Sequence, residues 1–111
     1  MTYHTALDAL GDRTRREIVE VLAAGPSSVG QIAERLPVSR PAVSQHVKVL
    51  VAAGLLETKA AGNRTVCQLL RQGFAEIRNY VDRLWDLPLQ RYAEAARRSA
   101  ASRGDEQSEE E

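Results

Sequence analysis

The chain has 111 residues, enough for one small domain. Its apolar residues (43%) include many alanines and few aromatics, which favours closely packed helices over a thick sheet core. A single cysteine excludes both a disulfide framework within one chain and a cysteine-rich zinc site. No signal peptide and no apolar stretch of membrane-spanning length is evident, so a cytoplasmic location is expected.

The zero net charge hides an uneven distribution of charged residues. Segment 37–72 holds five basic residues against one acidic residue, whereas segment 99–111 holds one basic residue against five acidic ones. A localised basic stretch is compatible with a polyanionic partner, although an ordinary solvated surface has a similar composition.

Two helices are predicted before the first proline. Segment Thr5–Leu10 carries its apolar residues on one helical stripe and ends at Gly11. Asp12 is expected to cap a second helix, which ends at Gly25-Pro26. Its first turn holds three arginines, and we expect them to form ion pairs with acidic residues rather than to contact a polyanion.

Two further helices follow, joined by a three-residue turn. Ser27 or Ser28 is expected to cap the third helix, which Pro37 ends. Ser39 caps the fourth, and Gly54 occupies the position of a C-terminal cap. The predicted buried stripe of the fourth helix is Val43, Val47, Leu50 and Val51.

A β-hairpin and a last helix complete the domain. Segments Leu55–Lys59 and Thr65–Leu69 are predicted strands, and Gly62-Asn63 between them is good turn chemistry. From about Gln72 the helical period returns, with a kink or a restart expected at Pro88. The composition predicts a domain of residues 1–98 and a disordered acidic tail of residues 99–111.

Four helices, two strands and a final helix, with a short turn between the third and fourth helices, are the order of a winged helix-turn-helix. The fourth helix of such a fold can enter the major groove of DNA, while the hairpin tip reaches the phosphate backbone or the minor groove. The candidate DNA-binding residues are Ser39, Arg40, Pro41, Ser44, Gln45, His46, Lys48, Lys59, Asn63 and Arg64.

Three segments resemble one known family. Leu10–Ile18, with the sequence LGDRTRREI, resembles the opening signature of ArsR-type (ArsR/SmtB) transcriptional regulators. Ser39–Leu50 resembles their recognition helix, and Ala53–Leu56 followed by a Gly-Asn-Arg wing extends the match. The resemblance covers about residues 5–98 and implies a homodimeric, mainly α-helical winged-helix repressor that binds promoter DNA and dimerises through its first and last helices.

The same resemblance implies a member that does not respond to metals. Metal sensors of the family carry a Cys-x-Cys site near the third helix or Asp and His ligands on the last helix. Here the corresponding third-helix segment is Ser28–Ile32, without cysteine, and the last helix has no histidine. We therefore expect no metal and no cofactor.

The last helix carries a long apolar stripe that could be core, a ligand pocket or a dimer interface. Because a small chain has little core to offer, a second copy is the favoured partner. The candidate interface residues are Leu7, Leu10, Phe74, Ile77, Tyr80, Val81, Leu84, Trp85 and Tyr92.

Two single residues are ambiguous. His46 is expected to make a structural hydrogen bond or a phosphate contact. Cys67 is expected to be a small buried hydrophobe, although an exposed thiol there would be open to oxidation.

Two rival classes of function are weaker. A winged-helix module that binds protein rather than DNA would not need basic residues on both the fourth helix and the hairpin, which are present here. An enzyme is disfavoured because no catalytic triad, phosphate-binding loop or pair of metal ligands is evident.

Overall fold

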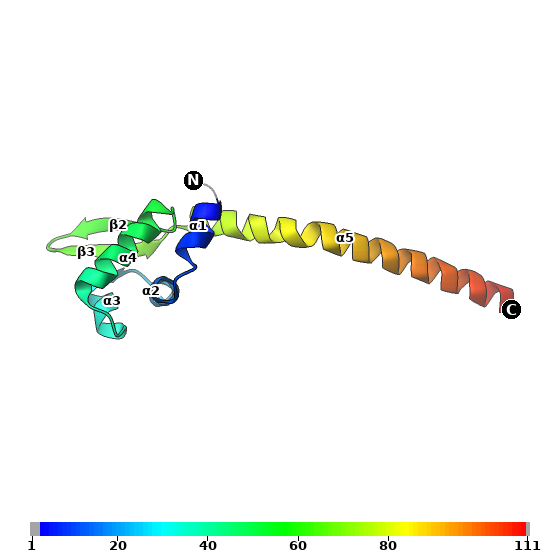
Figure 1. The fold of residues 1–111 in the computed structure, drawn as a ribbon, viewed down its shortest axis with the longest axis horizontal. Helices are drawn as coiled ribbons and strands as arrows, with labels where there is room; N and C mark the ends of the chain where they lie inside the picture. Colours follow the sequence, from blue (N-terminus) through cyan, green and yellow to red (C-terminus); the bar gives the residue numbers. More distant parts are fainter. Residues whose placement is uncertain (1–2, 111) are drawn as a thin grey trace. The chain divides into compact units, whose positions relative to one another are not determined.

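The computed structural model describes the backbone of residues 3–110 and the side chains of residues 4–101. The chain forms two compact units, Met1–Arg78 and Asn79–Glu111. Its elements, labelled in Figure 1, are α1 (Tyr3–Ala9), α2 (Arg13–Ala23), β1 (Ser27–Ser28), α3 (Val29–Arg35), α4 (Arg40–Ala52), β2 (Leu56–Ala61), β3 (Arg64–Leu69) and α5 (Arg71–Glu110).

Short polar side chains start the three middle helices, as predicted. The Asp12 carboxylate accepts a hydrogen bond from the Arg15 backbone N–H at 3.0 Å, at the start of α2. Ser28 caps α3 in a reciprocal box with Gln31, and Ser39 caps α4. Each cap satisfies a backbone donor that a helix terminus leaves free, so the sequence sets where these helices begin.

The hairpin belongs to a three-stranded antiparallel sheet with the order β1-β3-β2. The sequence predicts only the hairpin, and β1 is an addition: Ser27 pairs with Cys67, and Ser28 with Val66. Two residues are too short for a period-2 pattern, which is why β1 is invisible in the sequence. The hairpin turns at Gly62-Asn63, where Gly62 has a φ of 65°. A positive φ at the first turn position favours glycine.

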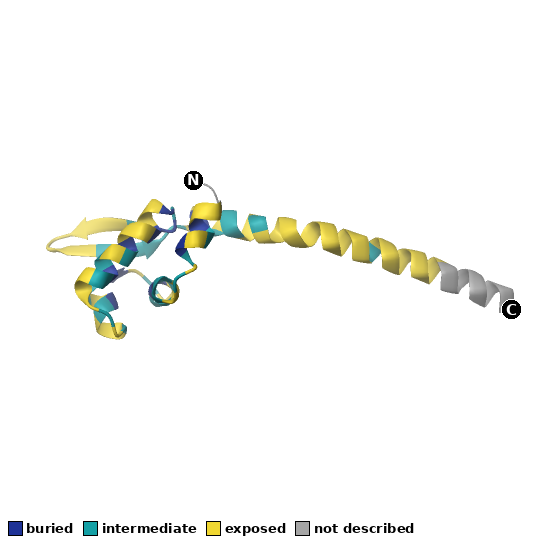
Figure 2. Ribbon diagram, viewed as in Figure 1, coloured by how far each residue is buried: buried dark blue, intermediate teal, exposed yellow. Residues whose placement is uncertain are grey.

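The core of the first unit lies where α1, α2, α3 and α4 meet the sheet. Its buried side chains are Ala6, Ala9, Ile18, Leu22, Ile32, Val43, Val47, Leu50, Ala53, Leu55, Leu56 and Cys67. Figure 2 shows buried positions on one side of α4 and exposed positions on the other. The predicted stripe of α4 is confirmed except for Val51, which is 37% exposed because it turns away from the core.

Two of the three arginines in the first turn of α2 make other contacts than the predicted ion pairs. Arg13 does pair with Glu17, at 3.1 Å. The Arg15 and Arg16 side chains instead donate to the backbone carbonyl oxygens of Ala9 and Leu10, at 2.6 and 2.8 Å. They satisfy free carbonyls at the C-terminal end of α1, where positive charge is favourable. Ion pairing is therefore the correct expectation for one arginine of the three.

Helix α5 continues through Pro88, so the restart that the sequence allowed there does not occur, although proline lacks one backbone donor. The helix extends to Glu110, and the disordered acidic tail that the composition predicts for residues 99–111 stays a prediction. Side chains 102–111 lie outside the described residues, and the division at residue 98 stays a prediction. No described helix combines the length and hydrophobicity needed to cross a membrane.

Candidate nucleic-acid interface

Helix α4 presents a polar face opposite its buried one. Val43, Val47 and Leu50 anchor it in the core. Gln45 and Lys48 are exposed away from this core, Ser44 is half-buried, and Arg40 is exposed at the first position of the helix. Pro41 in the first turn loses no hydrogen bond, because the N–H groups there have no partner within the helix. The core thus holds rigid a helix whose free face carries donors and acceptors suited to base edges and phosphates.

The Arg40 side chain lies over the backbone of α3 at Gly30. A Cβ at Gly30 would overlap the Arg40 guanidinium, so the absence of a side chain there makes room for it. Arg40 belongs to α4, and Gly30 to the first turn of α3. A cation of the fourth helix is thereby brought beside the start of the third.

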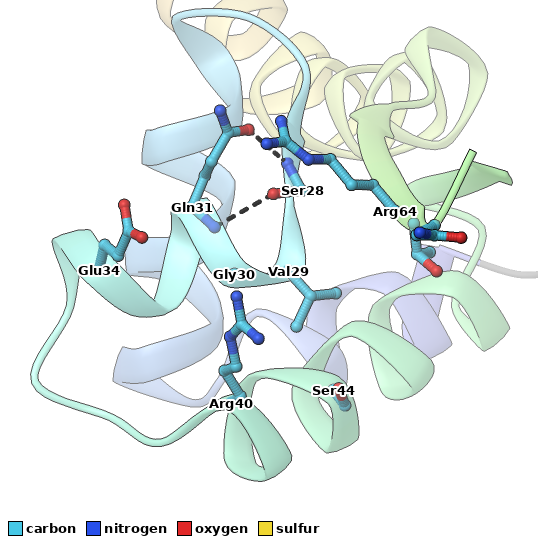
Figure 3. Close-up of a pocket in the computed structure, with 10 residues that line it drawn as sticks. Ser28, Val29, Gly30, Gln31, Glu34, Arg40, Ser44 and Arg64 are labelled. Atoms are coloured by element: carbon cyan, nitrogen blue, oxygen red, sulfur yellow. Dashed lines mark hydrogen bonds between the residues drawn. The ribbon is translucent and has the colours of Figure 1, made fainter. Parts of the chain in front are cut away.

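The tip of the β2–β3 hairpin, which is the wing of this fold, also lies near the first turn of α3. Asn63, Arg64 and Thr65 line one hollow of about 350 Å³ together with Arg40 and Ser44 of α4. Figure 3 shows the Arg40 and Arg64 side chains reaching toward the first turn of α3 from α4 and from the wing. The other lining residues are Ser28, Val29, Gly30, Gln31 and Glu34. We call this space the cationic hollow; it brings together predicted residues from two separate elements.

The sequence reasoning missed the contribution of α3 to this hollow. Gly30 and Gln31 lie beside Arg40 and Arg64, although neither was a candidate. The signal available in the sequence was the capping box, because it fixes the first turn of α3, which contains Gly30 and Gln31.

Two other candidates have partners within the chain. Lys59 of β2 lies with its Nζ 3.6 Å from Glu57 Oε1, and the same carboxylate oxygen accepts from Gln68 of β3. His46 of α4 lies with its Nδ1 3.9 Å from Asp12 Oδ2, at the start of α2. The structure thus places His46 in a contact between helices, and a role in DNA binding for either residue stays a prediction.

Asp12 makes the stability of the fold sensitive to acid. The hydrogen bond from the Arg15 backbone N–H is the largest influence that lowers the pKa of this carboxyl below its ordinary 3.8. Because the pKa of Asp12 is lower in the folded chain than in the unfolded chain, its ionised carboxylate stabilises the fold at any pH above the unfolded pKa. This stabilisation is lost as the pH falls through the folded pKa. We expect Asp12→Asn, which keeps a capping oxygen, to flatten the fall in melting temperature below about pH 4. Thermal unfolding between pH 2 and 7 measures this. An unchanged acid slope would contradict it.

The candidate dimer residues divide into two groups. Leu10, Phe74 and Ile77 pack against the core of the first unit, and Leu7 is half-buried. In the second unit Tyr80 is half-buried and Val81 is 39% exposed, while Leu84, Trp85 and Tyr92 are 54%, 60% and 75% exposed. Among the described residues, Val81, Leu84, Trp85 and Tyr92 form an exposed apolar stripe on α5, and Leu87 and Leu89 are exposed on its two flanks.

The thiol of Cys67 is fully buried in β3, as predicted. Burial raises its pKa, which keeps it protonated and unreactive. Among the described residues there is no group of three or more His, Cys, Asp or Glu side chains that could hold a metal ion.

Comparison with known proteins agrees with this geometry. Residues 10–59 match the model of a helix-turn-helix domain. The chain is 54% identical over 89 residues to an HTH-type transcriptional regulator of Mycobacterium tuberculosis, covering 80% of this chain and 83% of the relative. It is 35% identical over 54 residues to the transcriptional repressor SdpR of Bacillus subtilis, covering 49% of this chain and 60% of that protein.

A solved structure extends the match to the fold. The ArsR-like transcriptional regulator from Rhodococcus sp. RHA1 superposes with a TM-score of 0.74 at 29% sequence identity, covering 86% of this chain and 90% of that one. The helix-turn-helix model matches residues 10–59, and the chain covers most of the Mycobacterium regulator. The structure adds a wing that lies beside a helix with a polar face. Together these findings identify the family. The chain belongs to the ArsR family of winged helix-turn-helix transcriptional regulators.

Proposed function

We propose that this protein is a homodimeric transcriptional repressor that occludes promoter DNA in the cytoplasm. The observation that carries the proposal is the polar face of α4: Gln45 and Lys48 are exposed on a helix whose opposite side is buried, and Arg40 is exposed at its first position. A helix fixed in this way can lie in the major groove with its side chains against base edges. The name of the Bacillus relative, a repressor, supports the direction of regulation.

Each element has a separate role in the proposed complex. Gln45 reads a base, because its amide can donate to and accept from adenine at once. Ser44 is short and allows the helix to approach the groove closely. Arg64 at the wing tip contacts a phosphate or a narrow minor groove. The way in which α4 and the wing approach the DNA is set by Ser39, Pro41 and Asn63. Further positive or polar contacts to the DNA backbone come from Arg40, His46, Lys48 and Lys59.

Dimerisation through α1 and α5 is part of the proposal. The exposed stripe of α5 is large and apolar, and such patches on soluble proteins mark interaction surfaces. A two-fold symmetric dimer brings two α4 helices to two half-sites, so the operator should be a palindrome with half-site centres about 10 base pairs apart, or a multiple of that.

Regulation without metal is also proposed, as is the absence of enzymatic activity. The described residues offer no metal-binding group, and the residues around the cationic hollow include no nucleophile with an adjacent base. The signal that releases the protein from DNA is then something other than zinc or arsenite.

Footprinting on the DNA immediately upstream of the protein's own coding sequence tests the proposal. We expect a short protected palindrome, unchanged by EDTA and by micromolar zinc or arsenite. Retention on heparin that falls with salt should accompany it. A protein that neither protects this DNA nor binds heparin would instead be the protein-binding module. Loss of protection on adding metal would contradict metal independence alone.

A further inference from the structure

A second hollow lies between α4 and the sheet, and its walls are apolar. Its volume is about 410 Å³, within the range of roughly 300–1,000 Å³ typical of small-molecule sites. Val47, Val51 and Ala52 of α4 line it together with Val29, and Thr58 and Thr65 line it from the strands. Ser44 and Lys48 complete the lining. We call this space the apolar hollow.

The apolar hollow adjoins the cationic hollow. Val29, Ser44 and Thr65 line both, so the two hollows lie side by side between α4 and the wing, and we call them together the trough. One end carries Arg40 and Arg64, and the other carries the valines with Lys48. Glu34 also lines the cationic hollow, and its single negative charge against Arg40, Arg64 and Lys48 leaves an excess of positive charge along the trough.

DNA binding does not account for the apolar end. A phosphate backbone can use the cations, but it gains little from a wall of valines. Val51 is the clearest case: it is 37% exposed at the end of α4 and faces this hollow instead of the core. An apolar wall that is open to water favours a ligand that covers it.

We propose that the trough binds an amphipathic anion: a medium-length alkyl chain with one anionic headgroup. The chain lies over Val29, Val47 and Val51, and the headgroup lies among the cations, where Arg40 and Arg64 can donate hydrogen bonds to its oxygens. The cationic end of the trough matches the headgroup, and the apolar end matches the alkyl chain. A neutral alkane would match only the apolar end, and a small inorganic anion only the cationic end.

The consequence for regulation rests on the proposed function. Arg40, Ser44, Lys48 and Arg64 belong both to the trough and to the proposed DNA-binding surface, so ligand and DNA exclude each other. A ligand that binds only the DNA-free protein lowers the apparent affinity for DNA in proportion to its occupancy. The amphipathic anion is then the signal that releases the promoter.

Calorimetric titration of the full chain with sodium decanoate, below its micelle concentration and without DNA, tests the binding step. We expect saturable binding, with octanoate roughly 15-fold weaker because each buried methylene contributes about fourfold to affinity. Decanol, decyltrimethylammonium and acetate should bind much more weakly than decanoate, because each lacks one of the two matched features.

Two valine variants provide a matched comparison. Val51→Asp places a carboxylate in the apolar hollow and should weaken decanoate binding by roughly 10-fold or more. Val49→Asp makes the same change at a position of the same helix that is 42% exposed and lines neither hollow, and it should bind within about twofold of the unchanged protein. Circular dichroism checks that both variants fold. Arg64→Gln, at the exposed wing tip, should weaken decanoate but not decanol.

The inference is wrong if decanoate does not bind at low millimolar concentration, if decanol binds equally well, or if the two valine variants behave alike. Operator binding in the absence of decanoate is measured separately. A protein that binds DNA but not decanoate contradicts this inference alone, whereas one that binds decanoate but not DNA contradicts the proposed function alone.

Discussion

Replacing Leu84 and Trp85 together by glutamate is expected to convert a dimer into monomers. Both side chains are more than half exposed on α5 and belong to its apolar stripe. In the proposed dimer they lie in a dry interface, where each unpaired carboxylate costs several kcal/mol, about 3–5 by analogy with broken buried ion pairs. Sedimentation velocity should show monomers at micromolar concentration, and operator binding should be lost with the second half-site.

The matched control keeps the charge change and moves it off the stripe. Gln90→Glu combined with Arg97→Gln lowers the net charge by two, as the double glutamate variant does. Both positions lie on α5, turned about 120–140° from Leu84 and Trp85 by helical geometry. This control should stay dimeric. If the Leu84→Glu, Trp85→Glu variant remained a folded dimer, the assignment of the stripe to dimerisation would be wrong.

Replacing Gly73 by alanine is expected to destabilise the fold strongly. Gly73 is buried in the first turn of α5, where a Cβ would overlap the backbone carbonyl of Gly54 and come within 3.2 Å of a Leu55 methyl carbon. Neither the Gly54–Leu55 segment nor the start of α5 can move away easily. The Leu70 N–H donates to the Leu55 carbonyl at 2.8 Å, and Gly54 turns the chain with a φ of 78°.

The expected loss in free energy of unfolding is about 1–3 kcal/mol, the usual range for an overpacked core, despite a gain of about 1 kcal/mol from helix propensity. Urea denaturation at one fixed protein concentration measures it. Gly30→Ala is the control, because there the added Cβ meets only the movable end of the Arg40 side chain. It should be neutral or stabilising. Equal stability of the Gly73→Ala variant and the unchanged protein would contradict the account.

The sequence predicts best what local chemistry decides. Asp12, Ser28 and Ser39 cap their helices because a short oxygen-bearing side chain satisfies a free backbone donor, whatever the distant contacts. Gly62 and Gly54 have positive φ angles where a turn and a helix end were predicted. These positions fix the lengths of most elements, and with them the order of the winged helix-turn-helix.

Features that depend on distant contacts were missed or misjudged. Strand β1 exists only because β3 lies beside it, and Arg15 and Arg16 find the carbonyls of α1 only after α1 and α2 pack. Val51 follows the helical period yet faces a hollow, because the sheet does not close over that part of α4. A pattern along one element cannot show which neighbour will cover it.

The candidate DNA-binding residues also divide into features that follow from the local residue pattern and features that depend on packing between elements. The polar face of α4 and the wing tip follow from the residue pattern, and Arg40, Ser44 and Arg64 do line one hollow. The contacts of His46 with Asp12 and of Lys59 with Glu57 depend on packing between elements and could not be predicted.

A salt titration of Gln45→Ala and Arg64→Ala, on the footprinted operator and on a scrambled duplex, tests the central claim most directly. The claim is that α4 reads bases and the wing contacts the backbone. Gln45→Ala should lose about 1–3 kcal/mol on the operator and little on scrambled DNA. Arg64→Ala should weaken binding to both duplexes and reduce the salt slope by about one for each phosphate that the wing no longer neutralises. Equal loss for Gln45→Ala on both duplexes, with loss for Arg64→Ala only on the operator, would contradict the account.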